Sequence, residues 1–151
     1  MRTLVFSIFL YGAETWTIKE TEKKKIDAFE MWCLRKMLGI SWNEFRTNQS
    51  IRNEIGVNTS LLSTITSRIV SYFGHVSRRD HTSIERLLVN GMVNGTRARG
   101  RLPRRWTDQI KEATGYPLNE CSRRAAARAD WRRIFHRITG AVTTMTTLPR
   151  V

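Results

Sequence analysis

Apolar side chains recur every three or four residues through most of this chain, which is the period of one face of an α-helix. The clearest case is the segment 20–38, which Gly39 follows as a helix stop. Its apolar face is formed by Ile26, Phe29, Trp32, Cys33, Met37 and then Ile40. Because this spacing dominates the sequence, we expect a mainly α fold, an irregular helical bundle.

Capping residues and glycines set the limits of the other expected helices. Thr47 or Asn48 can begin a short helix that ends before Gly56, and Thr59 or Ser60 can begin a longer one. Pro103 is acceptable in the first turn of a later helix. The expected helices span residues 4–11, 20–38, 48–55, 60–76, 103–114 and 118–138, with 14–19 extended or in a turn.

Two segments lack the helical period. Residues 90–103 contain Gly91, Asn94-Gly95 and Gly100, and they are expected to form a basic Gly/Arg loop. Residues 140–151 are rich in Thr and aperiodic, so we expect a disordered tail. We therefore divide the chain into 1–80, a helical segment, 81–139, a basic helical region, and 140–151, the tail.

Positive charge is high and unevenly distributed. The chain has 26 Lys+Arg against 13 Asp+Glu, a formal net charge of +13 at pH 7. Residues 61–151 hold 17 of the basic and 6 of the acidic side chains, and of those 17 only Lys111 is a lysine. Arg binds phosphate in a bidentate way and stacks on bases. This composition favours RNA or DNA as a partner.

The densest Arg cluster lies at the end of the Gly/Arg loop. It consists of Arg97, Arg99, Arg101, Arg104 and Arg105. Guanidinium groups this close repel one another, and a phosphate backbone would relieve that repulsion. Trp106 follows directly and is either a base-stacking platform or a core residue.

The expected helix 118–138 carries a second group of cations. They are Arg123, Arg124, Arg128, Arg132, Arg133 and Arg137, with Asp130 as an acidic neighbour. A basic helix face can follow a phosphate groove, bind an anionic membrane surface or lie in water. From this region we select Arg124, Arg128 and Arg132 as candidate nucleic-acid contacts, together with Arg78 and Arg79.

Residue patterns for catalysis or metal binding are missing from the sequence. His75, His81 and His136 stand far apart with no cysteine nearby, which argues against a zinc site. The four aspartates are isolated among cations, unlike the carboxylates of a two-metal centre. Cys33 and Cys121 lie in apolar helical patterns typical of buried reduced thiols. We expect no enzymatic activity, cofactor or small-molecule substrate.

The N-terminus imitates a secretion signal without completing one. Arg2 precedes a short apolar run over residues 4–10, but the run is too short to span a bilayer. Tyr11 and Glu14 crowd the place where a cleavage site would lie. We expect a buried helix end, an intracellular location that is nuclear if the chain functions, and no membrane partner.

Six short blocks, taken in order, resemble a known family. They are 10–17 (LYGAETWT), 28–40 (AFEMWCLRKMLGI), 46–48 (RTN), 73–79 (FGHVSRR), 95–101 (GTRARGR) and 105–108 (RWTD). In this order and spacing the chain resembles the region after the palm in LINE-type (non-LTR) retrotransposon endonuclease–reverse transcriptases. The resemblance runs from about Leu4 to Ile138.

This resemblance implies a thumb-like segment over residues 1–80 and a basic C-terminal region over 81–139 that helps to hold template RNA and target DNA. The family's polymerase site, an aromatic-x-Asp-Asp motif in the palm, does not occur in this sequence. We therefore expect a non-catalytic fragment of an RNA-directed DNA polymerase. Its expected partners are RNA, DNA and the missing palm.

Two alternatives stay open at this point. The chain could be an inert structural remnant whose apolar face once packed on the palm, and exposed Trp and Phe side chains would mark it. It could also be a basic membrane-surface or secreted protein. That alternative needs the run 4–10 to act as a signal and the final helix to bind lipid.

Overall fold

The computed structural model describes residues 2–57, 59–91, 100 and 104–139. Within these ranges it has eight α-helices, two 3-10 turns and no strand, which confirms the expected mainly α fold. The elements are α1 (Arg2–Phe9), η1 (Ala13–Thr15), α2 (Glu20–Leu38), η2 (Trp42–Glu44), α3 (Asn48–Ile55), α4 (Leu61–Ser77), α5 (Ile84–Asn90), α6 (Trp106–Thr114), α7 (Leu118–Ala126) and α8 (Arg128–Thr139).

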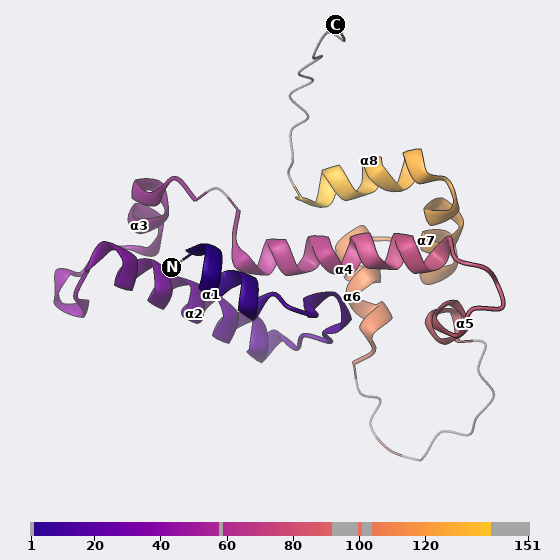
Figure 1. Ribbon diagram of the computed structural model, residues 1–151, viewed down its shortest axis with the longest axis horizontal. Coiled ribbons are helices and arrows are strands. Elements are labelled where there is room, and N and C mark those ends of the chain that lie inside the picture. Colours follow the sequence, from indigo (N-terminus) through magenta and orange to yellow (C-terminus); the bar gives the residue numbers. More distant parts are fainter. Residues whose placement is uncertain (1, 58, 92–99, 101–103, 140–151) are drawn as a thin grey trace, which may run out of the picture.

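Helix α4 is the central element of the bundle (Figure 1). Helix α8 lies along it and runs in the opposite direction, while η1, α2, α6 and α7 pack against it as well. The helix begins where the sequence predicts, because the Ser60 hydroxyl accepts a hydrogen bond from the Ser63 backbone N at 3.0 Å. Its buried face contains Ile65, Ile69 and Phe73 at the expected helical spacing.

Two clusters of buried side chains form the core. The larger one surrounds α4 and contains residues from Leu10 to Ile134. The smaller one joins α2 to α3 through Met31, Leu34 and Ile51. The larger cluster contains side chains from both sides of residue 80, where the sequence analysis divides the chain. That division stays a prediction.

A buried carboxylate fixes the junction of α2, α3 and α4. Glu30 of α2 is almost fully buried. It accepts a hydrogen bond from the Arg52 guanidinium at 2.9 Å and another from the Leu61 backbone N at 3.0 Å. The second bond satisfies a donor that the first turn of α4 would otherwise leave unpaired. One side chain therefore connects three helices.

The segment between η1 and α2 is held by α6. The Gln109 side chain donates to the Trp16 carbonyl at 2.8 Å and accepts from the Ile18 backbone N at 2.9 Å. One turn earlier, the Trp106 indole donates to the Glu14 carbonyl at 2.9 Å. An extended stretch without a strand partner thus obtains its hydrogen bonds from side chains of the C-terminal half.

The prediction of one continuous helix over 118–138 was wrong. The helix breaks at Ala127, whose backbone is extended with φ −84° and ψ 103°, so that α7 and α8 are separate. Ala127 is also exposed. The break turns the chain so that α8 can lie along α4 (Figure 1).

Four further points differ from the sequence analysis or fall outside the described residues. Helix α5 was not predicted. Helix α6 begins at Trp106, and Pro103, the expected first-turn residue, lies outside the described residues. On α2, Trp32 is 55% exposed and Met37 38% exposed, so they do not belong to a buried face. Most of the Gly/Arg loop and the whole predicted tail 140–151 also lie outside the described residues.

Candidate nucleic-acid interface

Several of the predicted contact arginines bind the protein itself. Arg104 forms an ion pair with Glu112, and Arg79 forms one with Glu85 at 2.5 Å. Arg105 is exposed, and its backbone N donates to the Asp108 carboxylate at 2.9 Å. Arg97, Arg99 and Arg101 lie outside the described residues, so their predicted role stays a prediction.

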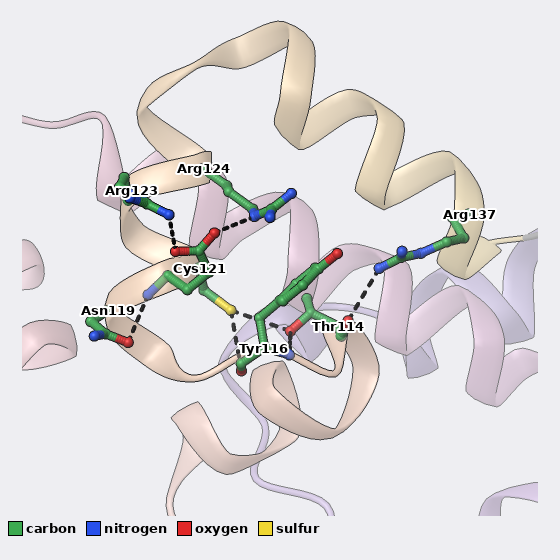
Figure 2. A network of polar contacts seen from close by, with 8 residues as sticks. Thr114, Tyr116, Asn119, Cys121, Arg123, Arg124 and Arg137 are labelled. Atoms are coloured by element: carbon green, nitrogen blue, oxygen red, sulfur yellow. Dashed lines mark hydrogen bonds and ion pairs between the residues drawn. The ribbon is translucent and has the colours of Figure 1, made fainter.

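Arg124 takes part in a polar network between α6, α7 and α8 (Figure 2). Its Nε donates to Glu120 at 2.6 Å, and its guanidinium lies 4.4 Å from the centre of the Tyr116 ring. Arg137 approaches the same ring at 5.5 Å and donates to the Thr114 carbonyl at 3.2 Å. The Arg124 side chain is thus engaged within the fold.

The sequence analysis counted Asp130 as the acid of this region and omitted Glu120. Glu120 accepts hydrogen bonds from Arg124 at 2.6 Å and from Arg123 at 2.5 Å. Hydrogen bonding by Arg124, followed by the charge of Arg123, lowers the pKa of the Glu120 carboxyl from its ordinary value. With Arg133, which pairs with Asp130, three of the six cations in the segment 118–138 therefore have an acidic partner on their own helix.

Trp106 is a core residue, one of its two predicted roles. Its ring centre lies 6.0 Å from that of Tyr72 and 6.3 Å from that of Phe73, and its Nε1 donates to Glu14. The ring is partly buried. The rest of the ring lines a pocket together with Arg105 and Thr107.

Three of the predicted arginines converge where α4 ends beside the start of α8. Arg78 caps the end of α4, is half-buried and donates to the Ala125 carbonyl at 2.9 Å. Arg128 and Arg132 come from successive turns of α8 and are exposed. Burial, followed by the positive charges of Arg128 and Arg132, lowers the pKa of the Arg78 guanidinium. Like charges thus lie close enough to repel one another.

The three guanidinium groups line a groove between α4 and α8 with a volume of about 390 Å³. We call it the α4/α8 groove. Its lining consists of Ser71, Arg78, Arg128, Trp131, Arg132, Phe135 and His136, with no Asp or Glu among these residues. Within the described part of the chain, no acidic side chain pairs with Arg128 or Arg132. The groove is therefore positively charged where Arg78, Arg128 and Arg132 line it.

Local sequence explains how the groove forms. Residues four apart lie on the same face of a helix, so Arg128, Arg132 and His136 point to the same side of α8. Trp131 is buried beneath them, and its Nε1 donates to the Val70 carbonyl of α4 at 3.1 Å. Gly74 has no side chain at the point where the indole crosses α4.

Sequence reasoning missed three residues of the groove: Ser71, Phe135 and His136. The sequence analysis considered His136 only in the argument against a zinc site. The signal that could have found it is its spacing of four from Arg132, which repeats the spacing of Arg132 from Arg128. Ser71 and Arg78 come from a distant part of the chain, and nothing local pairs them with α8.

The described residues do not form a metal site or a membrane span. Within them, no group of three or more His, Cys, Asp or Glu side chains is placed to hold a metal ion. Cys33 and Cys121 are buried and unpaired, as expected. None of the described helices is both long and apolar enough to cross a membrane.

Comparison with known proteins gives one informative match. No family model and no solved structure matches the chain. Over 147 residues the chain is 26% identical to a Caenorhabditis elegans protein named as an uncharacterized transposon-derived protein. The match covers 91% of this chain and 53% of that protein, so the chain spans about half the length of its relative. This similarity supports an origin in a transposable element.

Proposed function

We propose that the chain is a non-catalytic part of a LINE-type reverse transcriptase that binds RNA or DNA in the α4/α8 groove. The transposon-derived relative and the ordered sequence blocks support the origin. The net charge of +13 supports a polyanionic partner. The groove supplies a surface on which that partner would bind.

The convergence of Arg78, Arg128 and Arg132 without an acidic partner carries this proposal. A cluster of like charges is unfavourable in the free protein, and most strongly for the half-buried Arg78. Phosphate oxygens would remove this repulsion and accept paired hydrogen bonds from each guanidinium. The other arginines of α7 and α8 gain less from an anion, because Glu120, Asp130 or a backbone carbonyl already binds several of them.

The Arg cluster predicted from the sequence in the Gly/Arg loop would supply phosphate contacts of its own. If about five phosphates are neutralised, the logarithm of the affinity falls with the logarithm of salt concentration at a slope of about 3.5 for single strands or 4.5 for duplex DNA. Changing Arg97, Arg99, Arg101, Arg104 and Arg105 together to Gln measures the loop's share of that slope.

The decisive experiment compares two double variants of equal charge by fluorescence anisotropy over a salt series. Arg128→Gln/Arg132→Gln removes two cations of the groove. Arg123→Gln/Arg133→Gln removes two exposed cations of α7 and α8. Arg123 pairs with Glu120 at 2.5 Å, and Arg133 pairs with Asp130 at 3.5 Å. We expect the groove variant to reduce the salt slope by about 1.5–2 and affinity by at least about tenfold, and the control to change affinity by less than about threefold.

Two results would count against the proposal. One is an equal loss of affinity in both double variants, because binding would then follow net charge and not the groove. The other is weak, salt-independent binding to every nucleic acid tested. In that case the chain would be better described as an inert remnant.

An exposed apolar stripe favours this second candidate. Leu4 and Ile8 lie one turn apart on α1 and are 67% and 69% exposed. Tyr11, which follows the helix, is exposed as well. Apolar patches of this kind mark lost partners or aggregation sites. Self-association in sedimentation velocity that disappears in Leu4→Gln/Ile8→Gln, together with absent nucleic-acid binding, would support the remnant.

A further inference from the structure

We infer that the α4/α8 groove takes a single strand of nucleic acid in preference to a duplex. This inference rests on the proposed function and specifies its ligand. It follows from the order of side chains along the groove, from the kind of rings that line it, and from the absence of acidic residues among the lining positions.

Cations and aromatic rings follow one another along α8. Arg128 and Arg132 lie beside Arg78, near the C-terminal end of α4. Phe135 and His136 come one turn later, about 6 Å further along the helix, where Ser71 lines the opposite wall. A strand whose phosphates lie on the guanidinium groups would bring its next base over the rings.

The two rings provide faces on which a base can lie. Phe135 is partly buried and His136 is exposed, and their ring centres are 5.8 Å apart in an edge-to-face arrangement with an interplanar angle of 79°. Unpaired bases stack on Phe and His in proteins that bind single strands. A duplex presents its sugar-phosphate backbone outward and keeps its bases stacked inside, so it reaches the arginines but not the rings.

Charge in the groove suits a strand that passes through its whole length. No Asp or Glu is among the lining residues, and the nearest acid in sequence, Asp130, interacts with Arg133 at 3.5 Å. Ser71 adds a hydroxyl that can donate to a sugar or base oxygen. Trp131 lies beneath the rings and is buried, so it supports the floor and is not itself a stacking surface.

The test measures anisotropy with matched single-stranded and duplex oligonucleotides of one sequence, as RNA and as DNA. We expect the native chain to bind the single strand at least about tenfold more tightly than the duplex. Phe135→Leu and His136→Ala should each weaken single-strand binding by about 5–150-fold, which corresponds to about 1–3 kcal/mol for lost base stacking, and leave duplex binding within about twofold. Arg128→Gln/Arg132→Gln should weaken both.

Matched controls distinguish a loss of base stacking from a loss of protein stability. Phe9→Leu changes another partly buried Phe, which packs on Trp16 and Phe29 far from the groove. It should lower thermal stability about as much as Phe135→Leu and leave binding unchanged. His136 is exposed, so His136→Ala tests the rings even if Phe135→Leu does not fold.

Failure of this inference is distinct from failure of the proposed function. If Arg128→Gln/Arg132→Gln weakens binding but duplex binds as tightly as the single strand, the groove binds nucleic acid and the single-strand inference is overturned. Ring variants that weaken both ligands equally would overturn it too. If no nucleic acid binds in a salt-dependent, groove-dependent way, both proposals fail.

Discussion

The indole of Trp131 lies directly across Gly74, with its Nε1 bonded to the Val70 carbonyl at 3.1 Å. A β-carbon on residue 74 would overlap the pyrrole edge of that ring, closer than any van der Waals contact allows. Helix α8 can therefore lie this close to α4 only because residue 74 is glycine. The α4/α8 groove depends on the same contact, since Trp131 forms part of its lining.

Gly74→Ala should reduce the stability of the protein. In an ordinary helix interior this change adds about 1 kcal/mol of stability, but here the new methyl group displaces Trp131, and overpacking costs about 1–3 kcal/mol or more. Urea denaturation followed by Trp fluorescence measures the net effect. Ser71→Ala, an exposed change on the same helix, should stay within about 0.5 kcal/mol. A Gly74→Ala variant about 1 kcal/mol more stable than the native chain, the gain of an ordinary helix interior, would disprove the close packing.

Glu30→Gln should loosen the junction of α2, α3 and α4. The buried carboxylate binds Arg52 at 2.9 Å and the Leu61 backbone N at 3.0 Å. Hydrogen bonds to a charged group contribute about 1.5–3 kcal/mol, and the substitution weakens both. Chemical denaturation should show a loss of this size. Glu54→Gln removes a more exposed acid that pairs with Arg46, and it should cost at most about 1 kcal/mol.

Glu120 should make stability depend on acid pH. Its pKa is lowered in the folded protein, mainly by the hydrogen bond from Arg124. The stabilisation is therefore complete above the pKa of the unfolded carboxyl, about 4.3, and is lost as pH falls through the lower folded-state value. The stability difference between the native chain and Glu120→Gln, measured by urea unfolding from pH 7 to pH 3, should shrink toward zero. A difference that stays constant with pH would contradict this assignment.

Cys121 should react slowly with thiol reagents until the protein unfolds. Burial raises the pKa of this thiol, although the Thr114 hydroxyl at 3.2 Å partly offsets the effect. Burial raises the pKa of Cys33 too. Because the thiolate is the reactive form, we expect alkylation at pH 8 to be at least about tenfold slower in the folded chain than in urea. Rapid labelling of both thiols in the native chain would show that the core is open.

Gln109→Leu should release the segment between η1 and α2. It removes the donor to the Trp16 carbonyl and the acceptor for the Ile18 backbone N. Each lost hydrogen bond costs about 0.5–1.5 kcal/mol, so hydrogen exchange at Ile18 should accelerate by about tenfold. Gln49→Leu, at an exposed position on α3, serves as the control and should leave that exchange rate unchanged.

Helices could be predicted where a helical spacing of apolar residues coincides with capping residues at the ends of the segment. Helices α2 and α3 end at Gly39 and Gly56, both in the left-handed conformation with φ 69° and 70°. Thr47 and Ser60 accept the capping hydrogen bonds that their positions suggest. These features depend on neighbouring residues alone, so sequence is sufficient to find them.

The break at Ala127 could not be predicted in this way. Ala127 stands among alanines and arginines, which are strong helix formers, and with the break both α7 and α8 pack on α4. That feature therefore depends on tertiary packing. Helix α5 is different, because Ile84, Leu87 and Leu88 have helical spacing and Gly91 ends the segment. The sequence analysis overlooked these signals.

The candidate site, too, was only partly predictable from the sequence. Sequence could identify Arg78, Arg128 and Arg132 as basic residues on helix faces, but it gave greater weight to the dense cluster at 97–105. Whether a cation has an acidic partner depends on the fold. Arg124 lies four residues from Arg128, yet Arg124 is bound by Glu120 whereas Arg128 faces the groove.

The hydrogen bonds between Gln109 and residues 16–18 determine when this segment can fold during synthesis of the chain. Gln109 is made 91 positions after Ile18. At about 5–20 residues per second, roughly 5–18 s pass before the partner of this segment exists. Throughout that interval the Trp16 carbonyl and the Ile18 amide can bond only to water. The N-terminal segment therefore acquires its final conformation after α2, α3 and α4 have been made, when α6 emerges and closes over it.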